Sequence, residues 1–163
     1  QACGRLAEEH PDMKQSMGVV ILGGHSDEYE GRLPFDVYPI GYVSDPEKIV
    51  DVYNSADVFV LPSLEDNLPN TIMEAMACGV PCVGFNVGGI PEMIDHRKNG
   101  YVAAYKNADD LAEGMRWILQ EADYGALSRA AVGKVSSSYS QQSVALKYIE
   151  VYNQALAYRH YRL

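Results

Sequence analysis

The chain has 163 residues, of which 47% are hydrophobic and 21% are charged, and these proportions are typical of a globular domain with a buried core. Its formal net charge of −9 opposes non-specific binding to nucleic acid or to an anionic membrane, because the long-range field repels both. The three cysteines are odd in number and lack metal-ligand spacing, so they support neither a disulfide framework nor a zinc site.

The N-terminal segment has the pattern of the second half of a helix. In "QACGRLAEEHPDMK" (residues 1–14) the helical pattern ends at His10, because Pro11 cannot continue it. A strand normally precedes such a helix in an α/β chain, and in the usual strand order that first strand is central. We therefore expect a sheet that lacks its first strand.

Short apolar runs then alternate with longer segments of helical character. The predicted strands are residues 18–24, 37–43, 57–63, 81–86 and 100–105. The predicted helices are residues 45–54, 70–78, 91–95, 108–121, 124–135 and 141–158. In the last helix, apolar residues crowd one side at helical spacing: Val144, Tyr148, Ile149, Val151, Tyr152, Ala155 and Leu156. The alternation predicts a doubly wound, Rossmann-like α/β fold, with a parallel sheet covered on both faces and a single domain over residues 1–163.

Residues 57–78 place the start of a helix just beyond the end of a strand. "DVFVLPS" leads into the loop "LEDNLP", then Pro69 and Asn70 open the helix and Gly79 follows its end. A helix start presents unpaired N–H groups and a partial positive charge, and doubly wound folds bind ligands beyond the carboxyl ends of their strands. This arrangement favours a phosphate or pyrophosphate as ligand.

Two acids, Asp66 and Glu74, lie eight positions apart around that helix start. A carboxylate accepts hydrogen bonds from adjacent hydroxyls, so Glu74 suits a vicinal diol such as a ribose, and Asp66 suits sugar hydroxyls on the other side of the phosphates. Acids at these positions also cap helices or complement the helix dipole without binding anything. The spacing alone leaves both interpretations open.

The stretch "PSLEDNLPNTIMEAMACGVPCVGFNVGGIPEMI" (residues 62–94) closely resembles the donor-site signature of family 4 glycosyltransferases. In that signature an acid, seven residues and a glutamate precede "A-M-A-x-G-x-P". The resemblance extends from about Val19 to the final helix. Because the family consists of retaining enzymes of the GT-B fold, the resemblance implies the C-terminal, donor-binding half of such an enzyme, without its N-terminal acceptor domain.

The resemblance also implies roles for individual residues. Glu74 matches the glutamate that binds the nucleotide ribose, and Asp66 matches the catalytic-site acid that contacts the transferred sugar. Asp66 is one methylene shorter than glutamate, so either its loop approaches closer or Glu65 shares the role. The remaining donor-binding residues that it implies are Asn67, Leu68, Pro69, Asn70 and Thr71 at the sugar and pyrophosphate, and Tyr42 and Val43 near the base. We interpret "NVGGIPE" (residues 86–92) as a tight turn into a short helix in preference to a part of the site.

The reaction that the resemblance implies is transfer of a sugar from a UDP- or GDP-sugar to a saccharide or lipid-linked acceptor, with retention. Bacterial polysaccharide or lipopolysaccharide synthesis is the expected setting. The chain has no Asp-x-Asp motif, so metal-independent transfer without a cofactor is predicted. In the family, a basic clamp for the diphosphate follows the first strand; we expect it to lie upstream of Gln1, and the chain alone not to turn over.

The apolar pattern predicts the location of the protein. Neither a stretch of about 18 apolar residues nor a signal-peptide layout is present, which favours the cytoplasm and leaves open peripheral attachment to the inner membrane surface.

Two alternatives remain at this stage. An epimerase or phosphorylase of the same architecture is not expected to carry so uninterrupted a donor-site signature. A non-catalytic α/β module would bind a nucleotide or a partner protein and keep the two acids for capping.

Overall fold

The five predicted strands are all present, in two parallel sheets. The computed structural model describes residues 1–160, with side chains as far as Tyr158. The strands are β1 Gly18–Leu22, β2 Asp36–Gly41, β3 Phe59–Leu61, β4 Cys82–Phe85 and β5 Gly100–Ala103. Strands β1 and β2 form one sheet, and β3, β4 and β5 form the other in that order. The parallel α/β class is confirmed, whereas the single sheet that we expected is divided into two.

The division falls between β1 and β3. Within residues 1–160, β1 pairs only with β2, and β3 pairs only with β4. In the usual doubly wound order, these two open edges are where a central first strand would lie. Among residues 1–160, β1 and β3 therefore each have one edge without a paired strand.

The helices follow the predicted order, with small changes at their ends. They are α1 Ala2–Glu9, α2 Pro46–Asn54, α3 Asn70–Ala77, α4 Ile90–Met93, α5 Ala108–Arg116, α6 Tyr124–Ser138 and α7 Gln141–His160. Shorter helical turns cover Pro11–Gln15, Ser26–Tyr29 and Trp117–Glu121. Side-chain caps set three of the helix starts: Asp45 accepts from the N–H of Glu47, Asn107 from Asp109, and Asp123 from Ala126.

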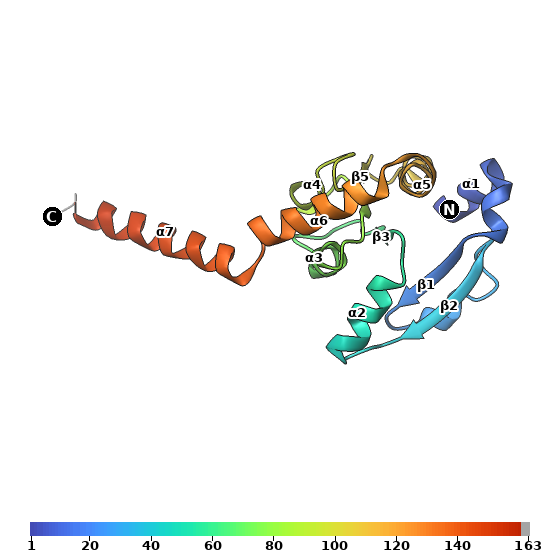
Figure 1. The fold of residues 1–163 in the computed structure, drawn as a ribbon, viewed down its shortest axis with the longest axis horizontal. Helices are drawn as coiled ribbons and strands as arrows, with labels where there is room; N and C mark the ends of the chain where they lie inside the picture. Colours follow the sequence, from blue (N-terminus) through green and yellow to red (C-terminus); the bar gives the residue numbers. More distant parts are fainter. Residues whose placement is uncertain (161–163) are drawn as a thin grey trace.

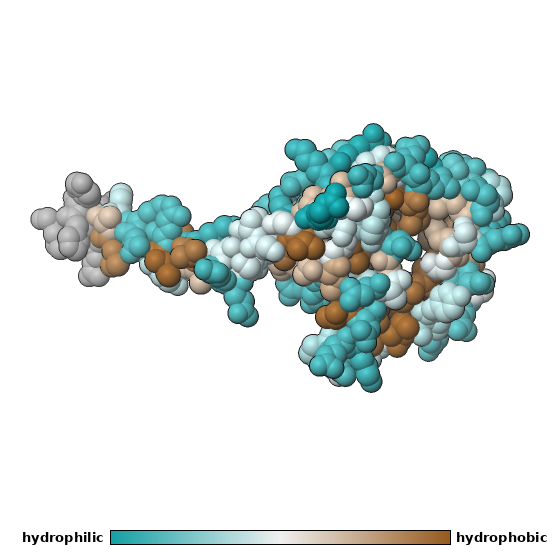
Figure 2. All heavy atoms as spheres, viewed as in Figure 1, coloured by the Kyte–Doolittle hydropathy of each residue, from teal (hydrophilic) through white to brown (hydrophobic). Residues whose placement is uncertain are grey.

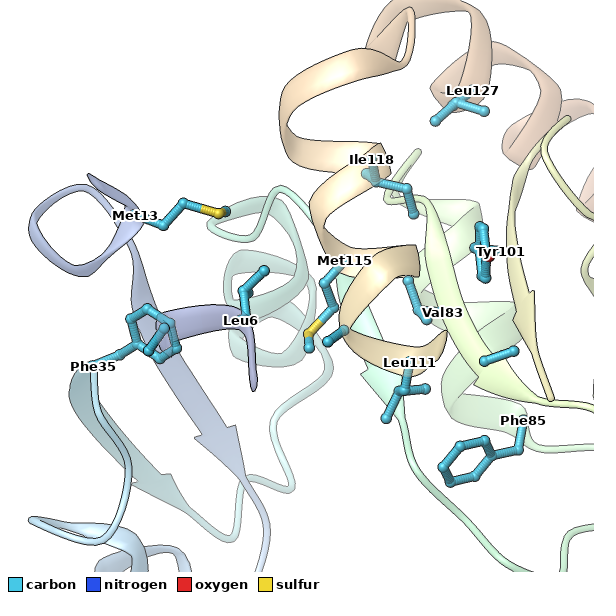
Figure 3. Packing of buried hydrophobic residues seen from close by; sticks show 13 residues of the cluster. Leu6, Met13, Phe35, Val83, Phe85, Tyr101, Leu111, Met115, Ile118 and Leu127 are labelled. Atoms are coloured by element: carbon cyan, nitrogen blue, oxygen red, sulfur yellow. The ribbon is translucent and has the colours of Figure 1, made fainter. Parts of the chain in front are cut away.

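Two buried clusters cover the two faces of the β3–β4–β5 sheet. Strand β4 is buried along its whole length, with Val83 and Phe85 in one cluster and Cys82 in the other. Figure 3 shows the first cluster, in which Leu6 of α1 and Met115 of α5 lie together between the two sheets. Helix α5 therefore joins α1 and the β1–β2 sheet to the rest of the domain (Figure 1).

The second cluster packs α3, α4 and α6 against the other face of β4. Its fully buried members include Ile72 and Met76 of α3, Ile90 and Met93 of α4, and Ala131 of α6. The core thereby fixes α3, whose first turn is the predicted anion site.

Helix α7 projects away from this body (Figure 1). Val144 near its start is partly buried, whereas its other large apolar side chains are exposed: Leu146, Tyr148, Ile149, Val151, Tyr152, Leu156 and Tyr158. Figure 2 shows separate hydrophobic patches on the arm to the left of the body, where α7 lies in Figure 1. The apolar side of this helix therefore covers no sheet within residues 1–160. No helix in the same range is both long and apolar enough to cross a bilayer.

Candidate functional site

The loop of residues 62–69 and the first turn of α3 present a group of unpaired backbone donors. The carbonyl of Pro69 accepts from the N–H groups of Ile72 and Met73, at 3.2 and 3.5 Å. In the part of the chain that the structure describes, no hydrogen bond is recorded for the N–H groups of Asn67, Leu68, Asn70 and Thr71, nor for those of residues 63–66 before them. Asn67, Leu68, Asn70 and Thr71 are the predicted backbone donors, and unpaired N–H groups at a helix start favour an anion.

The backbone at Asp66 lies closely against two glycines on the loop that follows β4. A Cβ atom on Gly88 would lie 1.6 Å from the carbonyl oxygen of Asp66, and one on Gly89 would lie 1.9 Å from that of Asn67. Gly88 also has a φ of 54°, which glycine adopts without strain. Because β3 and β4 are parallel neighbours, the loops that follow them meet at one edge of the sheet. The backbone at Asp66 therefore rests directly on Gly88 and Gly89.

This contact adds to the interpretation of "NVGGIPE" from the sequence. The turn into a short helix is confirmed, with Pro91 in the first turn of α4. The interpretation as a turn alone missed that the loop bearing Asp66 packs against these two glycines. The sequence did contain a signal for this contact, because two consecutive glycines permit a close approach of backbone to backbone.

Glu74 lies in the middle of α3, with its side chain exposed. Its Oε2 accepts a hydrogen bond of 3.0 Å from the hydroxyl of Tyr53, the buried tyrosine near the end of α2. Burial, together with the neighbouring Glu74 carboxylate, raises the pKa of the Tyr53 phenol well above its ordinary value, so the phenol stays a donor. Sequence reasoning missed Tyr53, since nothing near it in the chain indicates this contact.

The acids of the site have unused acceptor capacity. Glu65 and Asp66 have no side-chain hydrogen bond or ion pair, and Glu74 has only Tyr53, among the residues described. The ion pairs of the domain lie elsewhere, as in Lys134 with Asp95. No cluster of three or more metal-ligating side chains occurs among residues 1–160. The site thus offers backbone donors for an anion and free carboxylate oxygens for hydroxyl groups.

Tyr42 and Val43 lie in the segment between β2 and α2. Strand β2 ends at Gly41, whose φ of 72° turns the chain, so both residues lie beyond the strand and not within it as predicted. Tyr42 is 85% exposed, and no recorded hydrogen bond or ring contact in the described residues joins it to Asp66 or Glu74. Helix α2 begins shortly after this segment and carries Tyr53, the hydrogen-bond partner of Glu74, near its C-terminal end. The segment is therefore connected to Glu74 only indirectly, through α2.

A shallow surface hollow of about 370 Å³ lies on other residues. It is lined by Asn86, Pro91, Ile94, Asp95, His96, Lys98 and Val102. None of the predicted donor-binding residues belongs to it. The hollow is therefore not part of the candidate site formed by the acids and the start of α3.

Comparison with known proteins places this chain in a family. Residues 1–121 match the family described as Glycosyl transferases group 1. The D-inositol 3-phosphate glycosyltransferase of Corynebacterium jeikeium is 30% identical over 152 residues, which cover 86% of this chain and 35% of that protein. The N,N'-diacetylbacillosaminyl-diphospho-undecaprenol alpha-1,3-N-acetylgalactosaminyltransferase of Campylobacter jejuni is 26% identical, covering 88% of this chain and 39% of that protein.

Solved structures show the same fold. The crystal structure of Anabaena HepE in complex with UDP-glucose superposes with a TM-score of 0.74 at 19% identity, covering 94% of this chain and 44% of that one. The chain thus spans less than half the length of these relatives. Since the family match covers residues 1–121 of the 163, and since the start of α3 and its two flanking acids lie inside it, the chain belongs to the group 1 glycosyl transferases.

Proposed function

We propose that the chain is the nucleotide-sugar-binding domain of a retaining, family 4 glycosyltransferase. The observation that carries the proposal is the start of α3, where unpaired N–H groups lie between two acids that retain free acceptor oxygens. The N–H groups and the helix dipole would bind the diphosphate, and the acids would bind hydroxyl groups on either side of it.

In this proposal each residue has a definite task. Glu74 binds the ribose diol, and Asp66 binds hydroxyls of the transferred sugar. The backbone from Asn67 to Thr71 faces the sugar and the diphosphate, and the segment with Tyr42 and Val43 lies near the base. Because Asp66 is one methylene shorter than glutamate, the neighbouring Glu65 would share its role in binding the sugar.

The proposed chemistry places most of the catalysis at the departing diphosphate. Negative charge grows there as the glycosidic bond breaks, and donors already aimed at that position stabilise it without reorganising. The transfer is proposed to need no metal. A basic clamp for the diphosphate and the acceptor domain would come from the remainder of a longer protein, so the chain alone is expected to bind donor without turnover.

The acceptor is proposed to be a saccharide or a lipid-linked saccharide. Support comes from the Campylobacter relative, whose name gives an undecaprenol-linked acceptor and an alpha linkage. A role in bacterial polysaccharide or lipopolysaccharide assembly, in the cytoplasm or at the inner membrane surface, follows from the same proposal.

Calorimetric titration of the 163-residue chain with UDP and with GDP tests the proposal. One of the two is expected to bind, and Glu74→Gln is expected to weaken binding by about tenfold or more, as the loss of a charge-assisted hydrogen bond does. The matched control is Glu9→Gln, which neutralises an exposed glutamate at the end of α1. Absence of binding to both nucleotides would contradict the proposal and favour a partner-binding module.

A further inference from the structure

The hydrogen bond between Tyr53 and Glu74 joins a rigid group to a flexible one. The ring of Tyr53 is 3% exposed and packs edge-to-face on Phe59, with ring centroids 5.6 Å apart. Its hydroxyl reaches out of the core to Oε2 of Glu74 at 3.0 Å. The exposed glutamate would otherwise turn about its side-chain bonds, and fixing such a side chain costs free energy. The buried tyrosine therefore sets the direction of an exposed carboxylate.

The geometry leaves the carboxylate able to bind a ligand. A carboxylate has about four acceptor positions on its two oxygens, and Tyr53 occupies one of them. Oε1 of Glu74 has no partner in the described part of the chain. Two adjacent hydroxyls can therefore still be bound, one at each oxygen, while the tyrosine remains in place.

We propose that Tyr53 is a positioning residue, which presents the Glu74 carboxylate to the vicinal diol of the donor's ribose. This inference rests on the proposed function, because it takes Glu74 as the ribose ligand. The contrasting role is purely structural, in which Glu74 only satisfies the hydroxyl of a buried tyrosine. The two roles predict different effects of removing the Tyr53 hydroxyl. A positioning role lowers the affinity only for ligands that have the diol, whereas a purely structural role does not distinguish them from ligands that lack it.

The test is calorimetric titration of wild type and Tyr53→Phe with the nucleoside diphosphate that binds, UDP or GDP, and with its 2′,3′-dideoxy counterpart. Phenylalanine keeps the ring and its contact with Phe59, so the fold is retained. Loss of one positioning hydrogen bond is expected to weaken binding of the diol ligand by about three- to tenfold. Binding of the dideoxy ligand is expected to be the same in both proteins.

Tyr101→Phe is a matched control. It removes another hydrogen bond from a buried tyrosine to a carboxylate, the 2.7 Å bond to Asp110, on the opposite side of the sheet from α3. Thermal unfolding is expected to show a loss of stability in both variants, but only Tyr53→Phe should change the affinity for the diol ligand. A double variant, Tyr53→Phe with Glu74→Gln, should bind no more weakly than Glu74→Gln alone.

The outcomes separate this inference from the proposed function. If wild type binds neither nucleotide, both are overturned. If wild type prefers the diol ligand and Tyr53→Phe keeps that preference at full strength, the proposed function stands and the positioning role is overturned. If Tyr53→Phe weakens both ligands equally, the effect is a general loss of structure and the positioning role is again overturned.

Discussion

Helices α3 and α7 both carry large apolar side chains at helical spacing, but only those of α3 are buried. Ile72 and Met76 of α3 are fully buried, whereas Leu146 and Leu156 of α7 are each 60% exposed. The hydrophobic contribution to stability scales with the apolar area removed from water, so the two helices contribute very differently. Apolar spacing predicts a helix, and a complementary surface decides whether that helix adds to the core. The proposed donor site depends on the helix that has such a surface.

The largest effect is expected for Ile72→Ala in α3. The substitution leaves a cavity between α3 and the sheet, which costs about 2–5 kcal/mol of unfolding free energy. The matched control is Leu146→Ala in α7, expected to change it by about 0.5 kcal/mol or less. Urea unfolding of the two variants checks the comparison. Similar losses in both would mean that α7 packs against the body in solution.

Gly89→Ala is expected to have the next largest effect. Its Cβ would meet the carbonyl oxygen of Asn67, so the loop bearing Asp66 must move, at a cost of about 1–3 kcal/mol. In Gly133→Ala, on an exposed part of α6 with open space around the added atom, stability should instead rise by about 0.5–1 kcal/mol. Thermal unfolding measures both. A Gly89→Ala protein as stable as wild type would show that the loop is not held there.

A smaller effect on the free energy of unfolding is expected at alkaline pH, and it comes from the phenol of Tyr53. Its pKa is raised above 10.0 in the folded state, so above pH 10 the folded protein keeps a proton that the unfolded chain loses. Stability supplied by the protonated phenol is present below pH 10 and falls as the pH rises further. Tyr53→Phe should therefore show a shallower decline between pH 10 and 11 in urea unfolding.

A Tyr53→Phe protein whose alkaline decline in stability matches that of wild type would contradict this prediction. The phenol would then not be held in the buried, carboxylate-bound state that the structure shows.

The smallest effect is expected when α7 is removed. Because its apolar side chains are exposed and its contacts with α6 are few and polar, a protein ending at Ser140 should unfold within about 0.5 kcal/mol of the full chain. Urea denaturation compares the two proteins. A larger loss would contradict the exposed position of α7 and remove the contrast with α3.

Much of the fold was predictable from local patterns. Apolar runs bounded by glycine and proline gave the five strands in order, and each observed strand is shorter than the predicted run because pairing ends before the apolar sequence does. The start of α3 was predictable from Pro69, and with it the placement of Asp66 and Glu74 around a helix terminus. The partner of Glu74 was not predictable, since Tyr53 lies 21 residues from it in the chain.

The sequence by itself determined the order of strands and helices and the acids around the start of α3, because these depend on neighbouring residues. Only the tertiary structure decided the division into two sheets, the exposure of α7, the support of Asp66 by Gly88 and Gly89, and the hydrogen bond from Tyr53 to Glu74. Those features depend on surfaces that meet only after residues far apart in the chain have packed together, and local spacing carries no record of which surfaces will meet.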